Sequence, residues 1–369
     1  MKSDKKGAKI FLKVIGIILA VILAVILIYA AYVFLTYSRI EDNQKLKINQ
    51  PQEQSEEFDN SQMSIDKTYR VGTYNVGFGA YLPDYSFFMD GGKYSRCYSG
   101  ESGANAIKGA AGLSIEYKPD FMMFQEVDRD STRSYHVNQE NIITDIFKNY
   151  YETFAVNYNS AYLFYPFNEP IGASYSGIAS YSKYEITDSL RRSLPISTGF
   201  SKFIDLDRCY SINRIKVENG KDLVLINVHL SAYGNSDEIR EGQLNMLFDD
   251  MKKEMEKGNY IICGGDFNHD LKADEKDSEN CESWAYPFPR SKIPKGVRFA
   301  MDELDEKKIK SMPESNRNDD TEYIPGTTYV CTLDGFIVSD NVELRDYQIV
   351  DTGYAYSDHQ PVFMDFKLK

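Results

Sequence analysis

The chain has 369 residues, of which 42% are hydrophobic, so it can bury a core in one large or two small domains, and disorder throughout is excluded. Its formal net charge at pH 7 is −13, yet its first 13 residues carry +4, which leaves −17 for the remainder. So acidic a remainder repels phosphate backbones, which disfavours tight non-specific nucleic-acid binding, although a bound cation would reverse the local field.

An apolar run near the N-terminus is long enough to cross a bilayer. Residues 14–37 contain no charged residue, and as a helix rising about 1.5 Å per residue they exceed the ~30 Å hydrocarbon thickness. A cleavable signal peptide is the alternative, but its apolar region is usually about 7 to 15 residues and ends at a small-x-small site. We therefore expect a transmembrane anchor at 14–37 that holds the chain in a lipid bilayer.

The segments that flank this run predict the arrangement of the rest of the chain. Lysines in the short segment 1–13 precede the run and acidic residues follow it, so the positive-inside rule places 1–13 in the cytoplasm. Residues 38–67 are polar and poor in aromatics, and such a composition buries too little apolar surface to offset ordering entropy. We expect a flexible polar stalk at 38–67 and an extracellular catalytic domain at 68–369, tethered to the cell membrane by a single pass.

The region from Thr68 onward alternates between strand-like and helix-like segments. Its first elements, at 69–76, 104–117 and 121–124, indicate a β-α-β beginning. Strands outnumber helices and arrive both as hairpin neighbours and across helices, which favours two packed mixed sheets with helices outside. The irregular stretch 271–326 is either a functional loop or an insertion. Further strands are expected at 177–181, 210–217, 223–230, 260–263, 333–338 and 361–366, and further helices at 138–148 and 236–257.

Acidic, amide and histidine side chains recur at the ends of these apolar strands. Only four histidines occur in the chain, and two of them lie at strand ends beside acids. Hard carboxylate and amide oxygens suit Mg²⁺ or Mn²⁺, whereas a zinc site would contain more His or Cys. The pattern therefore predicts a magnesium-type site. The residues concerned are Asn75, Glu126, His229, Asp266, Asn268, Asp334, Asp358 and His359.

Each of these residues also has a purely structural interpretation. Glu126 could be an exposed residue after a buried strand, and His229 a satisfied core histidine. The amide and aspartate residues favour turns, and Asp358 with His359 could begin the last strand. The aromatic loops 81–98 and 158–167 either grip bases, sugars or lipid, or close onto the core.

The motifs TYN, QE, YSG, NVHL, GGDFN, LDGFIVS and SDHQPV, in this order, resemble the endonuclease/exonuclease/phosphatase superfamily. Each motif alone is weak, but GDFN and SDHQPV together near the end of the chain are specific. That superfamily includes DNase I-like nucleases, apurinic endonucleases, sphingomyelinases and inositol phosphatases. The resemblance spans Tyr69 to Phe366 and implies an α/β fold, a four-layered sandwich of two packed mixed β-sheets flanked by helices, with the active site at one end of the sheets.

The resemblance also implies which residues bind metal and which move protons. It assigns Glu126 to the metal, with Asn75 and Asp358 close by. His359 is similar to the catalytic histidine of the superfamily, and Asp334 would orient it through the second ring nitrogen. The chemistry is coherent, because a carboxylate that fixes an imidazole tautomer is a common general-base arrangement.

Further residues resemble groups that contact the attacking water or the phosphate. Asp266 and Asn268 match the pair that performs both tasks, and Tyr175 in YSGIASYS looks like a tyrosine that hydrogen-bonds a phosphate oxygen in the apurinic branch. Packing is the alternative for Tyr175, since the chain has 28 tyrosines. His229 matches a histidine of the DNase I-like and sphingomyelinase branches, and Arg208 an arginine that neutralises phosphate. These residues are typical of different branches of the superfamily, so the resemblance does not identify the substrate.

Together these inferences predict a hydrolase of phosphoric esters that uses Mg²⁺, with Mn²⁺ or Ca²⁺ as alternatives, to assist attack by an activated water. The favoured activity is that of an extracellular, membrane-tethered nuclease, so nucleic acid is the favoured partner; no protein partner is predicted. Phosphomonoesters are a further substrate class. The alternatives are a phospholipid, sphingomyelin or sugar/inositol-phosphate phosphoesterase, suggested by the tether and the acidic surface, and a catalytically silent surface-binding module.

Overall fold

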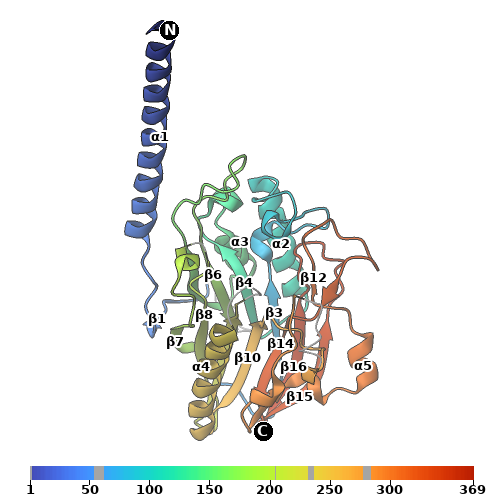
Figure 1. Cartoon of the computed structure of the whole chain (residues 1–369). Helices are drawn as coiled ribbons and strands as arrows, with labels where there is room; N and C mark the ends of the chain where they lie inside the picture. The colour runs from blue at the N-terminus through green and yellow to red at the C-terminus, as the bar shows by residue number, and fades with distance from the viewer. Residues whose placement is uncertain (1, 54–61, 204, 232–236, 277–283) are drawn as a thin grey trace.

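The computed structural model describes residues 2–53, 62–203, 205–231, 237–276 and 284–369. A long N-terminal helix stands away from an α/β body (Figure 1). Among the described residues, the body contains two sheets of seven strands each, which pack against one another and carry helices on their outer faces. The predicted four-layered sandwich of two mixed sheets is therefore confirmed.

The first sheet has the strand order β15-β16-β3-β4-β6-β5-β2. Only β3 and β4 run parallel among its described pairs. Helices α2 and α3 cover its outer face, where Ile107 and Ala110 pack with Phe124 and Phe363. The bounds are β2 (Ile48–Asn49), β3 (Thr68–Asn75), β4 (Phe121–Asp128), β5 (Tyr151–Asn159), β6 (Tyr175–Ser182), β15 (Val342–Ile349), β16 (Val362–Leu368), α2 (Gly100–Glu116) and α3 (Gln139–Ile146).

The second sheet has the order β1-β7-β8-β9-β10-β14-β11, with β9 and β10 parallel. Helix α4 (Asp237–Glu256) packs on it through Leu244, Leu247 and Met251, which are buried at the helical spacing that the sequence shows. The strand bounds are β1 (Gln44–Lys45), β7 (Ile186–Ser193), β8 (Cys209–Lys216), β9 (Asp222–His229), β10 (Tyr260–Asp266), β11 (Val297–Phe299) and β14 (Asp334–Ser339).

The two parallel pairs bring polar strand ends together. Register places Asn75 beside Gln125 at the end of β3 and β4, so Glu126 follows directly. In the other sheet Asp266 lies opposite both His229 and Asp334. Because parallel strands end at the same edge of a sheet, these side chains gather at one end of the sandwich.

The stretch 271–326 follows β10 and contains β11, which pairs with β14 of the same sheet. Trp284 and residues 316–320 line the pocket end of the sandwich, whereas residues 300–303 pack against β14 and β15. The stretch also contains several short elements. They are η6 (Arg290–Lys292), η7 (Ala300–Glu303), α5 (Glu306–Ser311) and β12 (Asn316–Arg317), which pairs with β13 (Val330–Cys331). Elsewhere single turns occur at η1 (Gly77–Gly79), η2 (Phe88–Asp90), η3 (Thr132–Ser134) and η4 (Phe200–Phe203).

Short parts of the predicted stalk 38–67 pair with the body. Strand β1 pairs with β7, β2 pairs with β5, and Met63 forms a bridge to Val217. At 44–45 and 48–49 strand pairing satisfies backbone N–H and C=O groups although most of the side chains are polar, in contrast to the flexible stalk that the composition predicts. Residues 54–61 of the predicted stalk lie outside the described residues.

Helix α1 (Lys2–Thr36) contains the predicted anchor. From Lys6 to Thr36 it is long and apolar enough to cross a membrane, and its most apolar window is not buried against the body. A signal sequence near an N-terminus passes the same test of length and composition. The helix therefore agrees with either a membrane span or a leader.

A buried carboxylate supports the second sheet from outside. Glu254 of α4 accepts two hydrogen bonds of 2.8 Å from Arg214 and one of 2.8 Å each from Lys257 and Asn259. Burial alone would raise the pKa of Glu254, but the hydrogen bonds from Arg214, Lys257 and Asn259 outweigh it and lower that pKa to about 2. This carboxylate therefore stabilises the fold above its ordinary pKa of 4.5 and ceases to do so as the pH falls through 2.

Glu254→Gln is expected to lower the free energy of unfolding at pH 7 by about 2 kcal/mol, because charge-assisted hydrogen bonds are lost. The difference from the wild type should shrink between pH 4.5 and pH 2. Denaturant titrations of the detergent-solubilised chain at several pH values measure both effects. Glu256→Gln, an exposed change on the same helix, is the matched control. A deficit of equal size at pH 3 and pH 7 would contradict the assignment.

Candidate active site

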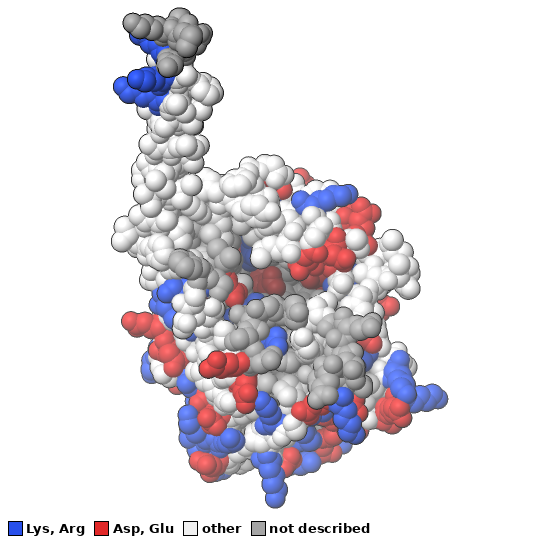
Figure 2. All heavy atoms as spheres, viewed as in Figure 1, with Lys and Arg blue, Asp and Glu red and all other residues white. Residues whose placement is uncertain are grey.

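A pocket of about 380 Å³ opens at the end of the sandwich where the parallel strand pairs end. Figure 2 shows acidic side chains in and beside a recess of the body below α1. The pocket is lined by residues of both sheets and of the stretch 271–326. They are Asp90, Glu126, Arg208, His229, Asp266, Asn268, Trp284, Asn316, Arg317, Asn318, Asp319, Asp320, Leu333, Asp358 and His359.

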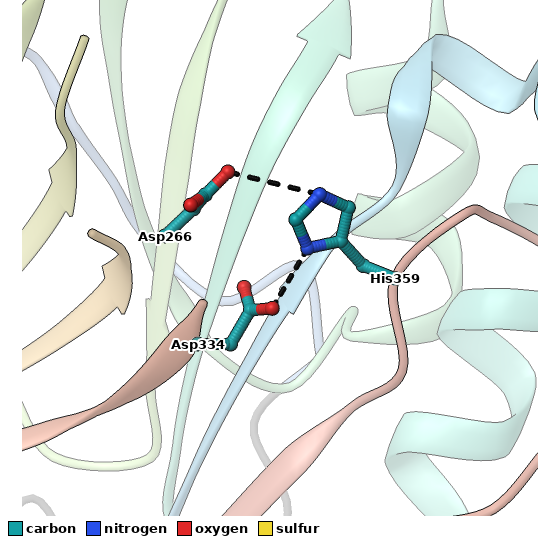
Figure 3. A group of neighbouring side chains, drawn as sticks. All are labelled: Asp266, Asp334 and His359. Atoms are coloured by element: carbon teal, nitrogen blue, oxygen red, sulfur yellow. Dashed lines mark hydrogen bonds and ion pairs between the residues drawn. The ribbon is translucent and has the colours of Figure 1, made fainter. Parts of the chain in front are cut away.

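His359 is held by a buried carboxylate. Its Nδ1 lies 2.7 Å from Oδ2 of Asp334, and the same oxygen accepts a 2.7 Å hydrogen bond from the hydroxyl of Ser315. The other ring nitrogen, Nε2, lies 3.7 Å from Oδ2 of Asp266 (Figure 3). The carboxylate therefore favours the tautomer with a proton on Nδ1, which leaves Nε2 facing the pocket.

Asp266 ends β10 in a sharp turn. Its Oδ1 accepts the backbone N–H of Asn268 at 2.8 Å, and Asn268 itself has a left-handed φ of 50°. Gly265 is required before it, because a Cβ there would lie 1.9 Å from the carbonyl oxygen of Val228. The side-chain amide of Asn268 donates to the carbonyl oxygen of Leu230 at 2.9 Å. This turn fixes the direction of the Asp266 carboxylate.

Glu126 faces Asp266 across the pocket, and one amide joins them. Asn75 Nδ2 donates to Glu126 Oε1 at 3.2 Å and to Asp266 Oδ2 at 3.0 Å, while Asn75 Oδ1 accepts the N–H of Gly77. Glu126 lies in a bulge of β4 with φ 56°, which turns its side chain out of the strand alternation. Asn75 thus presents its NH₂ group to the carboxylates, an orientation that differs from that of the metal ligand expected from the resemblance.

His229 and Arg208 also line the pocket. His229 Nε2 lies 3.6 Å from Asp266 Oδ2 and 4.0 Å from Glu126 Oε1. Burial, together with the nearby charges of Arg208 and His359, lowers the pKa of His229 well below its ordinary value, so its ring is neutral. Arg208 donates to the carbonyl oxygen of Leu230 at 2.9 Å. Its buried Nε has no hydrogen-bond partner within the described part of the chain.

Tyr175 is not among the described residues that line the pocket. It begins β6, is half-buried, and its backbone carbonyl accepts the N–H of Arg129. Asp358, in contrast, does line the pocket, and its Oδ1 accepts a hydrogen bond from Ser357 at 3.1 Å. Of these two residues that the resemblance assigns to the site, the structure places Asp358, but not Tyr175, in the described pocket lining.

The stretch 271–326 supplies pocket residues that the sequence motifs do not reveal. Arg317 is buried and donates to the carbonyl oxygen of Leu82 at 2.9 Å, and Trp284 donates from its indole to Asn318 at 2.5 Å. Asp319 follows on the same strand end. A run RNDD in a long loop usually means a solvated turn, and only the structure shows that residues 317–320 line the pocket.

The carboxylates of this pocket are incompletely neutralised by the side chains around them. Burial raises the pKa of Asp266 to about 7 despite the nearby His359, and it raises the pKa values of Glu126 and Asp358 as well. Burial opposes protonation of His359, but Asp334, Asp358 and Asp266 outweigh it and raise its pKa well above the ordinary value. Such a cluster of oxygen ligands with unmatched negative charge fits a hard divalent cation.

The atoms of Asp266, Asp334 and His359 also lie within 4.8 Å of one another, a spacing that suits a metal ion. However, Nδ1 of His359 and Oδ2 of Asp334 already contact each other at 2.7 Å, so these two atoms are occupied by their mutual hydrogen bond. Glu126, Asp358 and the pocket-facing oxygen of Asp266 are therefore the better candidates for a cation, and the Asp334–His359 pair is better suited to proton transfer.

Comparisons with known proteins agree with this architecture. A sequence profile described as the Endonuclease/Exonuclease/phosphatase family matches residues 72–359. No curated protein matches the chain in sequence. Similar solved structures include an endonuclease/exonuclease/phosphatase from Beutenbergia cavernae DSM 12333, with a TM-score of 0.55 and 16% identity over 82% of this chain and 72% of that one.

Two further similar structures come from animals. The human Nocturnin catalytic domain with a bound sulfate anion has a TM-score of 0.52 and 15% identity, covering 84% of this chain and 96% of that one. TDP2 from D. rerio, complexed with a single-strand DNA product, has a TM-score of 0.53 and 16% identity over 82% of this chain and all of that one. At these identities the likeness is one of fold.

Proposed function

Because the chain belongs to the endonuclease/exonuclease/phosphatase family, we propose that it is a divalent-metal-dependent phosphoesterase that hydrolyses phosphodiester bonds, with phosphomonoesters as a further substrate class. The family and its structural relatives are hydrolytic phosphoesterases. The observation that carries the proposal is the convergence of Glu126, Asp266 and the Asp334–His359 pair at one pocket, from strands of both sheets.

Glu126 and Asp358 are proposed to hold Mg²⁺, with Asp266 beside them and Asn75 positioning both Glu126 and Asp266 through its NH₂ group. When bound, Mg²⁺ would neutralise charge that develops on the phosphoryl oxygens and assist departure of the leaving group. Mn²⁺ and Ca²⁺ have related oxygen preferences and remain alternative cofactors.

A cation bound among the carboxylates that raise the pKa of His359 would lower that pKa again and leave Nε2 without a proton. His359 is then proposed to take a proton from the attacking water at Nε2, while Asp334 holds the ring and stabilises its charged form. Asp266 would orient the same water, since its Oδ2 lies 3.7 Å from that nitrogen. Asn268, His229 and Arg208 would donate hydrogen bonds to the phosphoryl oxygens. Tyr175, the other residue that the resemblance assigns to a phosphate oxygen, is outside the described pocket lining, and its role stays a prediction.

Two substrate classes compete. An extracellular nuclease is supported by His229 and Arg208 at the pocket wall, and a related fold binds a single-strand DNA product. A lipid-headgroup or small phosphodiester is supported by the pocket rim, where Asp90, Asp319 and Asp320 would repel a long polyanion. The rim charge favours the second class, and bound cations would weaken that preference.

We propose that α1 anchors the chain in the cell membrane. A single pass with the N-terminus in the cytoplasm would place the pocket outside the cell, as the charge distribution of residues 1–13 predicts. The helix length and composition support a span.

A substrate panel tests the function directly. The full chain in detergent or nanodiscs, given DNA, RNA, sphingomyelin, phospholipids, inositol phosphates and bis-p-nitrophenyl phosphate, should hydrolyse at least one class with Mg²⁺ and none with excess chelator. Activity that persists in chelator would contradict metal dependence. A folded chain that leaves the whole panel intact with Mg²⁺, Mn²⁺ and Ca²⁺ would favour a catalytically silent binding module instead.

A further inference from the structure

Aromatic side chains of the body meet α1 near the end of its apolar run. The hydroxyl of Tyr29 donates to the carbonyl oxygen of Tyr162 at 3.0 Å, and the N–H of Tyr162 donates to the hydroxyl of Tyr32 at 3.1 Å. The rings of Tyr29 and Phe164 lie edge to face with centroids 5.2 Å apart. These contacts fix the loop after β5 beside the helix.

Next to this junction lies an exposed apolar surface, which we call the aromatic rim: Phe88, Met89, Phe164, Tyr165 and Phe167. The exposed fractions of Met89, Tyr165 and Phe167 are 65%, 63% and 85%. Together with Tyr29 of α1, the rim lines a groove of about 510 Å³. No charged residue occurs in the sequence segments 86–89 or 158–168. A contiguous exposed patch of this kind marks an interaction site.

The length of α1 indicates what covers the aromatic rim. Because the body contacts α1 at Tyr29 and Tyr32, the span that fits the structure begins and ends earlier than the expected 14–37. The 19 residues from Ile10 to Ile28 form about 28 Å of helix at 1.5 Å per residue, close to the ~30 Å hydrocarbon thickness. Lys13 lies near the cytoplasmic end, where a lysine side chain can reach the headgroups. Tyr29 and Tyr32 follow at the other end, and tyrosines are enriched at the membrane–water interface. The body begins to contact α1 at this level (Figure 1), so a bilayer spanned by α1 would have its outer surface at the aromatic rim.

We propose that the aromatic rim inserts into the outer interface of the phospholipid bilayer that α1 spans, so that the body is docked on the membrane rather than suspended above it. The proposal rests on the proposed anchoring by α1. The three rim residues Phe164, Tyr165 and Phe167 supply a wedge without charge, which suits the boundary between headgroups and acyl chains.

Docking would also set where the active-site pocket opens. Met89 of the aromatic rim and Asp90 of the pocket lining are adjacent in η2. The mouth of the pocket would therefore open beside the lipid headgroups. This placement strengthens the proposal that the substrate is a phosphoester presented at the membrane surface.

Tryptophan quenching by brominated lipids tests the docking. The chain has one tryptophan, Trp284, so Trp284→Phe provides a silent background for the full chain in nanodiscs with one chain per disc. Phe167→Trp reports on the aromatic rim. Ile22→Trp in the middle of α1 reports on the anchor, and Glu256→Trp, exposed at the end of α4 far from the pocket, is the matched control.

We expect quenching in the Phe167→Trp variant to be several-fold stronger than in the Glu256→Trp control and to approach that in the Ile22→Trp variant. Quenching of the anchor reporter alone, with the rim reporter no different from the control, would overturn the docking and leave the anchor in place. No quenching of the anchor reporter would overturn the anchor and the docking together. None of these readouts requires substrate, so they are independent of whether the chain proves to be a phosphoesterase.

Discussion

Asp334→Asn is expected to lower kcat by about 10³- to 10⁴-fold while KM changes little, because an asparagine can hold the His359 ring in the wrong tautomer. In the wild type Asp334 accepts from Nδ1 of His359 at 2.7 Å. An amide that turns its NH₂ group toward that nitrogen forces the ring proton onto Nε2, the atom proposed to receive a proton from water. Steady-state kinetics on the substrate identified by the panel measure the effect.

Ser315→Ala is the matched control for this prediction. It removes the second hydrogen bond to Oδ2 of Asp334 but keeps the carboxylate, so a loss of about tenfold or less is expected. Circular dichroism of both variants checks the fold. If Asp334→Asn retains activity within about tenfold of the wild type, the proton-transfer role of the pair is wrong, and the metal-binding interpretation of the same cluster gains support.

Glu126→Gln is expected to raise the Mg²⁺ concentration for half-maximal activity by about 100-fold or more, because a neutral amide replaces a carboxylate ligand. The side chains that hold Glu126 in place are unaffected, since Asn75 still has an oxygen to which it can donate. The glutamine keeps the length and shape of the glutamate in the left-handed position at φ 56°. The variant should therefore fold normally and lose activity mainly at low Mg²⁺ concentration.

Metal binding also has a readout without turnover. A cation that binds only the folded state stabilises it by about 2.7 kcal/mol at 100 times its Kd. Mn²⁺ or Mg²⁺ should thus raise the Tm of the wild type, and Glu126→Gln should reduce that shift. Asp320→Asn removes the same charge from the exposed rim of the pocket and should keep most of the shift. Equal losses in both variants would mean that the effect is one of general charge rather than of coordination.

The acidic pocket explains why net charge alone is a poor guide to the substrate. Six of the described lining residues are carboxylates, at positions 90, 126, 266, 319, 320 and 358. Burial raises the pKa of Asp266 to about 7, so its charge is costly until a cation arrives. A phosphate therefore meets a very different potential in the metal-loaded pocket and in the metal-free one.

The sequence alone determined the strands whose ends carry the site. Hydrophobic runs at 223–230 and 260–263 predict β9 and β10. His229 near the end of the first run and Asp266 just after the second could be named as site candidates because strand ends in such sheets converge. The motifs GDFN and SDHQPV, in this order, were sufficient to predict the family, and the profile match over residues 72–359 confirms it.

Tertiary structure alone decided features that depend on contacts between distant segments. The pairing of residues 44–49 with β7 and β5 has no signal in a polar, low-hydropathy sequence, since the partners lie more than a hundred residues away. The same holds for Arg317 and Asp319, which reach the pocket from a long loop whose composition predicts only a turn.

Side-chain orientation was the other quantity that the sequence left open. A motif names Asn75, but only the hydrogen bond from Gly77 to its oxygen shows that the NH₂ group faces Glu126 and Asp266. Likewise YSG names Tyr175, and only the packing of β6 shows that this side chain is not among the described residues of the pocket wall. Local pattern specifies which elements form, because hydrophobic periodicity is a property of neighbours in the chain; which atoms meet is decided by register and packing between elements that the chain separates widely.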